Sequence, residues 1–150
     1  MRHGEAEEHS PDGDSGRRLT REGAEAVTRS STVLARLAWI PANVLHSPYV
    51  RAVETAARVA MARPGTRLVV DKGLVPHGNA EDAARRVLAD DDDVLVVSHL
   101  PLLPAILELL VGGSCPFFVS PGAIVRLRVL GPRRAAVVGF LTQDDLVALL

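Results

Sequence analysis

The chain has one cysteine, Cys115, one lysine, Lys72, and few aromatic side chains, which make up 3% of its 150 residues. A single cysteine excludes an internal disulfide and is typical of a reducing compartment, so we expect a cytoplasmic protein. The start, Met1-Arg2-His3-Gly4, turns acidic at once and does not resemble a signal peptide. The longest apolar stretch, residues 100–113, contains two prolines and is too short to span a bilayer. We therefore expect no membrane partner.

Charge and hydropathy narrow the class further. The formal net charge is −1, which provides no overall field to recruit nucleic acid or an anionic membrane. The hydrophobic fraction of 47% and the mean hydropathy of +0.17 indicate a folded globule rather than a disordered chain. A chain of this length fits one domain, so we expect a single domain over residues 1–150.

Helical and strand patterns alternate along the chain. Strands are predicted at 44–46, 67–70 and 94–97. Helices are predicted at 20–38, from Ser47-Pro48 onward, at 80–89, and from Pro101 to a point before Gly112-Gly113. Residues 123–130 and 135–141 flank a Gly-Pro-Arg-Arg turn and predict a β-hairpin, which Thr142 follows as the cap of a short helix. This order predicts an α/β fold: a three-layer α/β/α sandwich with a mostly parallel central sheet and an antiparallel edge.

Three short motifs place arginine or histidine where a strand ends. They are Arg2-His3-Gly4-Glu5, Ser47-Pro48-Tyr49-Val50-Arg51 and Ser98-His99-Leu100-Pro101. In open α/β sheets, ligands bind in the crevice outside the carboxyl ends of the strands. Two arginines and two histidines meeting there would form a pocket for a phosphoryl dianion, with a nucleophile inside it.

His3 is the candidate nucleophile. An imidazole accepts a phosphoryl group only when it is neutral, and the adjacent Arg2 guanidinium disfavours its protonation. Gly4 would leave room for substrate and allow a sharp backbone turn. Taken alone, the tripeptide is equally compatible with an ordinary loop histidine.

Arg51 and His99 each have a functional and a structural interpretation. Arg51 lies in the first turn of a predicted helix, where unpaired N–H groups favour an anion and a guanidinium can grip two phosphate oxygens. The alternative is a surface ion pair with Glu54. His99 would donate to a non-bridging phosphate oxygen in the transition state, and the alternative is a core histidine bonded to the backbone.

Together these residues resemble a known family. Arg-His-Gly near the amino terminus, Ser-Pro-x-x-Arg-Ala-x-x-Thr and Ser-His-x-Pro are similar to the motifs of the histidine phosphatase (phosphoglycerate mutase-like) superfamily. Within it, the short length, Arg17-Arg18-Leu19-Thr20 and Ser98-His99-Leu100-Pro101 most resemble bacterial SixA-type phosphohistidine phosphatases. The similarity covers essentially the whole chain and implies a phosphoglycerate mutase-like fold.

The resemblance implies a mechanism and a set of roles. His3 would take the phosphoryl group as a covalent phosphohistidine, which water then hydrolyses. The implied phosphate pocket consists of Arg2, Arg51 and His99, with Gly4, Ser47 and Arg17 as further substrate-binding residues. The adjacent Arg18 competes with Arg17 for the place at the pocket mouth. Members of the family need no metal or other cofactor, and His3 and His9 lack a familiar zinc-ligand spacing.

Two features depart from the family pattern. The nucleophile normally ends a central strand of several apolar residues, whereas only Met1 precedes Arg2 here, so we expect a first strand truncated before Arg2 and poor stability or atypical pairing. Many branches also carry a glutamate that protonates the leaving oxygen. Glu81 is the candidate acid, with an exposed place in the first turn of a helix as the alternative.

A weak or absent general acid would bear on which substrate we expect. A phosphoramidate P–N bond needs less help to break than an ester, which favours phosphohistidine in a partner protein. The alternatives are a small-molecule phosphomonoesterase acting on a phosphoester, or an inactive phosphate- or protein-binding module. The oligomeric state, monomer or dimer, stays open. The polar loop at 5–18, which includes Asp14, is expected to be solvated.

Overall fold

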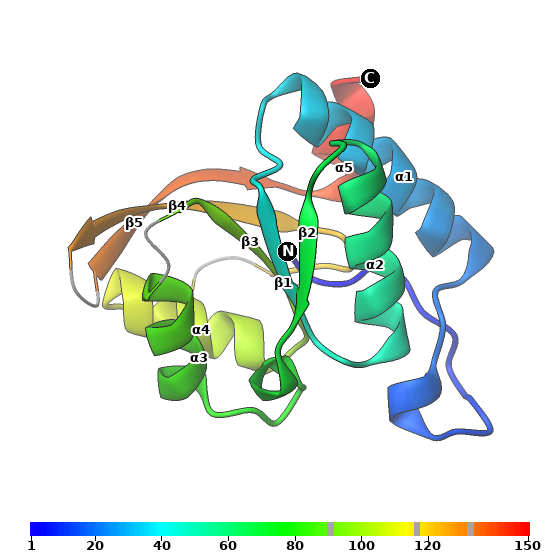
Figure 1. Ribbon diagram of the computed structural model, residues 1–150, viewed down its shortest axis with the longest axis horizontal. Helices are drawn as coiled ribbons and strands as arrows, with labels where there is room; N and C mark the ends of the chain where they lie inside the picture. Colours follow the sequence, from blue (N-terminus) through cyan, green and yellow to red (C-terminus); the bar gives the residue numbers. More distant parts are fainter. Residues whose placement is uncertain (90–91, 116–117, 132–133) are drawn as a thin grey trace.

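The computed structural model describes residues 1–89, 92–115, 118–131 and 134–150 (Figure 1). The helices are α1 (Arg21–Arg36), α2 (Val50–Met61), α3 (Ala80–Leu88), α4 (Leu102–Val111) and α5 (Gln143–Ala148), with short 3-10 turns η1 (Asp14–Gly16) and η2 (Lys72–Leu74). The strands are β1 (Asn43–His46), β2 (Arg67–Val70), β3 (Val94–Val97), β4 (Ile124–Gly131) and β5 (Arg134–Leu141).

Two sheets are present in the described part of the chain. β1 lies between β2 and β3 in a parallel sheet, in a register that places Val44 beside Leu68 and Leu95. β4 and β5 form the predicted antiparallel hairpin. The short apolar runs of the sequence therefore form the strands that their pattern predicted.

The first three residues join these two sheets. On one side, the His3 N–H donates to the Ser98 carbonyl at 3.1 Å, and Arg2 and Ser98 form a parallel bridge. On the other side, the Arg2 N–H donates to the Ala123 carbonyl at 3.0 Å, just before β4. Residues 1–3 therefore lie between β3 and the hairpin, and His3 comes to the edge where β3 ends.

The helices cover the central sheet on both faces (Figure 1). α1, α2 and α5 share a core cluster with Val44, Leu95 and Val97 of the sheet. α3 and α4 pack in a second cluster with Leu45 and Val96. Because neighbouring side chains of one strand enter different clusters, the sheet is buried on both faces, as the three-layer prediction requires.

The helix starts follow local capping chemistry. Thr20 caps α1 as predicted, with its hydroxyl accepting from the Gly23 N–H at 2.9 Å. The predicted start of the next helix at Ser47-Pro48 is wrong by a few residues: α2 begins at Val50, because the Ser47 hydroxyl accepts from the Tyr49 N–H and holds a turn before the helix. Within the described residues, no helix is long and apolar enough to cross a membrane.

Candidate active site

The carboxyl ends of the parallel strands bring three segments together. β1 ends at His46, β3 is followed by Ser98 and His99, and His3 is paired to Ser98. α2 begins a few residues after β1, so its first turn lies at the same edge. The four residues predicted to be catalytic, Arg2, His3, Arg51 and His99, therefore meet at one place.

The hydrogen bonds of His3 fix which ring nitrogen carries the proton. Its Nδ1 lies 2.7 Å from the Gly4 carbonyl oxygen, which can only accept, so Nδ1 carries the proton. Its Nε2 lies 3.2 Å from Arg51 Nε, which can only donate. Both contacts require the same neutral tautomer, with the lone pair on Nε2. That lone pair is the one available to a phosphorus atom.

Arg51 is buried beside His3 at the start of α2. Its side chain is 5% exposed, and the Arg51 carbonyl accepts from the Thr55 hydroxyl at 2.7 Å. The same hydroxyl accepts from the Gly4 N–H at 3.1 Å. Thr55 thus ties the backbone that follows His3 to the helix that carries Arg51. The alternative of a surface pair between Arg51 and Glu54 is wrong, because Glu54 pairs with Arg18 instead.

His99 faces His3 from the end of β3. The two ring centroids are 5.0 Å apart, and the Tyr49 ring packs edge-on against His99 at 5.1 Å. His99 is 1% exposed, and among the described residues neither of its ring nitrogens has a hydrogen-bond partner. The alternative of a core histidine bonded to the backbone is therefore not what the structure shows. An unpaired buried imidazole is costly, so a ligand that bonds to it would relieve that cost.

Arg2 approaches the same pocket from the N-terminal segment. Its Nη1 donates to the Val119 carbonyl at 3.0 Å, and its Nε is buried without a partner in the described residues. Burial, with the nearby Arg51 charge, lowers the pKa of Arg2 below its usual value. The pocket therefore holds cationic and imidazole donors whose hydrogen-bonding capacity is only partly used.

Both imidazoles are neutral at physiological pH. Burial, assisted by the positive charges of Arg51, Arg2 and Arg17, lowers the pKa of His3 to about 4, against a smaller raising effect of its bond to the Gly4 carbonyl. Burial, followed by His3 and Arg51, lowers the pKa of His99 to about 3. The sequence interpretation that guanidinium charge keeps His3 unprotonated is supported, although burial is the larger cause.

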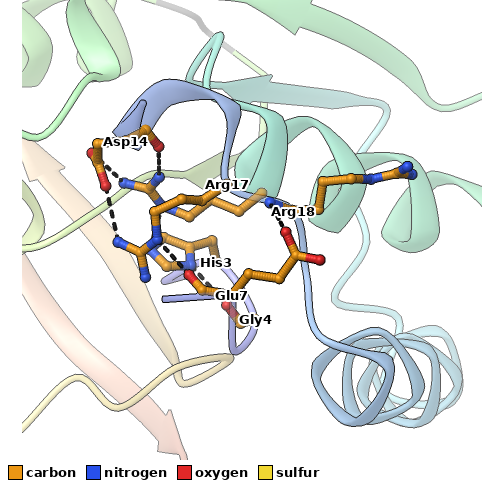
Figure 2. Close-up of polar contacts among 7 residues, drawn as sticks. His3, Gly4, Glu7, Asp14, Arg17 and Arg18 are labelled. Atoms are coloured by element: carbon orange, nitrogen blue, oxygen red, sulfur yellow. Dashed lines mark hydrogen bonds and ion pairs between the residues drawn. The ribbon is translucent and has the colours of Figure 1, made fainter. Parts of the chain in front are cut away.

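Arg17 and Arg18 differ in their surroundings (Figure 2). Arg17 Nη1 contacts the Asp14 carboxylate at 2.9 Å, and its Nε donates to the Glu7 carbonyl. Arg18 extends away from His3 and pairs with Glu54. Residues 5–7 and 18–20 pair around an isolated antiparallel bridge between Ala6 and Leu19, and Arg17, just before this pairing, is extended, so the side chains of Arg17 and Arg18 point to opposite sides. Of the two arginines, Arg17 lies at the pocket.

Gly4 and Ser47, predicted to bind substrate, have structural contacts. A Cβ on Gly4 would lie 2.6 Å from Val27 Cγ2, so the space that glycine leaves is filled by α1. Ser47 is fully buried, and its hydroxyl accepts from the Tyr49 N–H at 3.3 Å. Both residues shape the backbone next to the pocket.

Glu81, the candidate acid, lies exposed in the first turn of α3. It makes no hydrogen bond or ion pair with the pocket residues in the described part of the chain, which matches the alternative interpretation of Glu81. Within the same described ranges, no three histidine, cysteine, aspartate or glutamate side chains gather closely enough to hold a metal ion.

Sequence reasoning missed three residues of the site. Thr55 is the last residue of the Ser-Pro-x-x-Arg-Ala-x-x-Thr motif, and its spacing of four from Arg51 on a helix could have shown that they contact each other. The Arg51 guanidinium carbon lies 5.0 Å from the centroid of the Tyr49 ring, and the same ring packs against His99. Asp14, expected to be solvated in the polar loop, bonds to Arg51 and Arg17.

Comparison with known proteins identifies the family of this chain. Residues 1–82 match the family described as the histidine phosphatase superfamily (branch 1). A curated relative, the phosphohistidine phosphatase SixA homolog of Haemophilus influenzae, is 34% identical over 139 residues, which cover 85% of this chain and 84% of the relative.

Solved structures show the same fold. The structure of the protein histidine phosphatase SixA complexed with tungstate has a TM-score of 0.90 at 26% identity, covering 97% of this chain and 96% of that one. The alpha-ribazole phosphatase from Shigella flexneri has a TM-score of 0.72 at 19% identity, covering 95% of each chain, and shows a likeness of fold alone. The family match over more than half of the chain, together with the curated relative, shows that this chain belongs to the histidine phosphatase superfamily and is a hydrolase.

Proposed function

We propose that this phosphatase hydrolyses phosphohistidine in a partner protein through a covalent intermediate on His3. The observation that carries the proposal is the His3 tautomer: Nδ1 donates to the Gly4 carbonyl, and the Nε2 lone pair faces Arg51. Two curated or solved relatives are described as phosphohistidine or protein histidine phosphatases, which supports the substrate class.

Phosphoryl transfer would proceed in two displacements. In the first, a bond forms between His3 Nε2 and phosphorus while the substrate P–N bond breaks, and the leaving imidazole nitrogen takes up a proton. In the second, a water oxygen bonds to phosphorus, the His3–phosphorus bond breaks, and inorganic phosphate leaves. Arg2, Arg51 and His99 would donate hydrogen bonds to the non-bridging oxygens as charge develops on them.

The shortage of a general acid fits an imidazole leaving group. Glu81 is exposed at the start of α3. Burial raises the pKa of the Asp14 carboxyl, but the hydrogen bonds from Arg17 and Arg51 outweigh it and hold that pKa below its usual value. Asp14 is therefore an anion at neutral pH and a poor proton donor. A leaving imidazole is basic enough to take its proton from water.

A trapping experiment tests the covalent step. The protein is mixed with a labelled phosphoramidate, and a phosphoryl adduct that is labile in acid and stable in alkali is expected. His3→Ala should abolish the adduct. His9→Ala, which removes an exposed histidine of the polar loop at 5–18, should retain it. A folded wild-type protein that forms no adduct would instead support a phosphate- or protein-binding module.

A substrate panel tests the partner. A phosphohistidyl protein should be hydrolysed with a higher kcat/KM than sugar phosphates and other small phosphoesters. The reverse order would support a small-molecule phosphomonoesterase on the same scaffold. The single cysteine favours a partner in a reducing compartment.

A further inference from the structure

The turn η1 carries an aspartate into the pocket. Asp14 is the first residue of this turn, which lies in the loop between His3 and α1. Arg51 Nη1 donates to the Asp14 carbonyl at 2.6 Å, and Arg51 Nη2 donates to Asp14 Oδ2 at 3.1 Å. Arg17 Nη1 donates to the other carboxylate oxygen, Oδ1, at 2.9 Å (Figure 2). One carboxylate thus bridges two guanidinium groups.

The Asp14 carboxylate contacts the two arginines as a phosphoryl group would. The carboxylate oxygens, like those of a phosphate, are shared between separate arginine side chains. Arg51 Nε is directed to His3 Nε2, so three of the five N–H donors of Arg51 are engaged by His3 and Asp14. A phosphoryl group that approaches His3 Nε2 therefore meets an arginine that is already partly occupied and an aspartate of the same charge sign.

The rest of the pocket lacks an anion. Arg2 Nε and both ring nitrogens of His99 are buried without partners in the described residues, so Asp14 satisfies only the Arg51 and Arg17 side of the pocket. A phosphoryl group bound at His3 could reach both sides. Asp14 therefore holds part of the anion position and leaves the remainder for substrate.

Asp14 can leave this position more easily than Arg51 can. Its side chain is 53% exposed, whereas that of Arg51 is 5% exposed and is held at the start of α2. A displaced carboxylate would pass directly into water, where its charge is well solvated. The guanidinium would stay in place and change its partner.

We propose that Asp14 is an internal competitor of the phosphoryl group: it holds Arg51 and Arg17 in the free enzyme, yields Arg51 to substrate, and rebinds as phosphate leaves. This inference rests on the proposed function, because it takes the His3 pocket as the phosphate site. It makes Asp14 a positioning residue whose contact with Arg51 weakens the binding of free phosphate and speeds product release.

Equilibrium binding of inorganic phosphate tests the proposal without reference to activity. Isothermal titration calorimetry compares the wild type with Asp14→Asn, which removes the competing charge with little change of shape. The dissociation constant for phosphate should fall roughly two- to fivefold in the variant, the size that the one partly exposed ion pair given up by Arg51 contributes. A purely structural role of Asp14 predicts the opposite sign, because a misplaced Arg51 would bind phosphate more weakly.

Asp12→Asn is the matched control. It makes the same charge change in the same loop, and the exposed Asp12 carboxylate has no ion pair within the described ranges. It should leave the phosphate dissociation constant unchanged. An equal effect of both variants would mean a general change of field and would overturn the proposal, as would an unchanged or weaker affinity in Asp14→Asn.

Kinetics give a second readout. If product release is slowed, Asp14→Asn should lower KM and strengthen inhibition by phosphate while kcat falls or stays constant. Failure of the two proposals can be told apart. Phosphate that binds the wild type but not more tightly to Asp14→Asn refutes only the displacement, whereas a lack of binding to both proteins removes the phosphate pocket as well.

Discussion

Neutral imidazoles at His3 and His99 should make folding stability depend on pH in a specific window. The pKa of each ring lies below the value of 6.5 that applies to an exposed imidazole, at about 4 for His3 and about 3 for His99. On acidification the unfolded chain therefore takes up protons first, at a pH where the folded protein does not. Stability is present in full above pH 6.5 and is lost as the pH falls toward these folded-state values.

The size of the loss follows from these pKa values. Between pH 6 and pH 5 each histidine should lower the free energy of unfolding by about 1 kcal/mol, and the two together by roughly 2 kcal/mol. Asp14 and Glu54 have pKa values below their usual range, so their protonation costs stability at a lower pH. The buried Met1 amine, whose pKa burial lowers from 8.0 to about 5, also costs stability as the pH falls through this window. The share of the two histidines is therefore the difference between the wild type and variants that lack these rings.

Urea unfolding at several pH values measures this dependence. The single tryptophan, Trp39, packs against the core and provides a fluorescence signal. Phosphate-free buffers are needed, because an anion that binds only the folded state would raise its stability. The double variant His3→Asn/His99→Asn should keep only the weaker dependence that the buried Met1 amine contributes, and each single variant should lose about half of the difference between the wild type and the double variant.

A matched control uses histidines that are exposed in the folded protein. His9→Asn/His77→Asn, at two exposed positions, should retain the wild-type dependence, because it leaves the buried rings of His3 and His99 in place. If the His3 and His99 variants lost stability on acidification in parallel with the wild type, these imidazoles would not be neutral in the folded state. The account of His3 as an unprotonated nucleophile would then be wrong.

Two further predictions concern the backbone around the nucleophile. Gly4→Ala should destabilise the fold by about 1–3 kcal/mol in chemical unfolding, because its Cβ would lie 2.6 Å from Val27 Cγ2. Val27→Ala should cost less stability in the Gly4→Ala variant than in the wild type, because it removes the clash. Gly113→Ala is the control and should be nearly neutral, because its Cβ would meet nothing within 4 Å in the described structure. Thr55→Val should cost about 1–3 kcal/mol by leaving the buried Gly4 N–H unpaired, whereas Thr28→Val, on the exposed face of α1, should cost less; equal costs would contradict the linking role of Thr55.

The fold and the central residues of the site followed from local patterns. Short apolar runs between helical segments indicated parallel strands, and parallel strands end at one edge of a sheet. Because Arg51 and His99 each lie just beyond such a run or in the next helical turn, their meeting could be inferred from the sequence. The place of His3, which only Met1 and Arg2 precede, followed instead from the resemblance of its Arg-His-Gly motif.

The details that were missed depend on contacts between distant parts of the chain. Asp14 lies 37 residues from Arg51, and nothing in a polar, glycine-containing loop distinguishes an aspartate that reaches a pocket from one in water. Arg17 and Arg18 differ through the extended backbone next to the isolated bridge between Ala6 and Leu19. The close approach of Gly4 to Val27 of α1 likewise requires the packed helix.

The charge balance of the pocket explains why neutral histidines and a resident carboxylate occur together. Arg2, Arg51 and Arg17 each lower the pKa of His3, and a fourth positive charge at His99 would add to their repulsion. Keeping both rings neutral limits the positive charge and preserves the lone pair that His3 needs for attack. Asp14 offsets part of the remaining charge while the pocket is empty, and its field is the one that raises the pKa of His99. A bound phosphoryl dianion would do the same more strongly, so Asp14 and substrate act as alternative counter-ions of one cationic pocket.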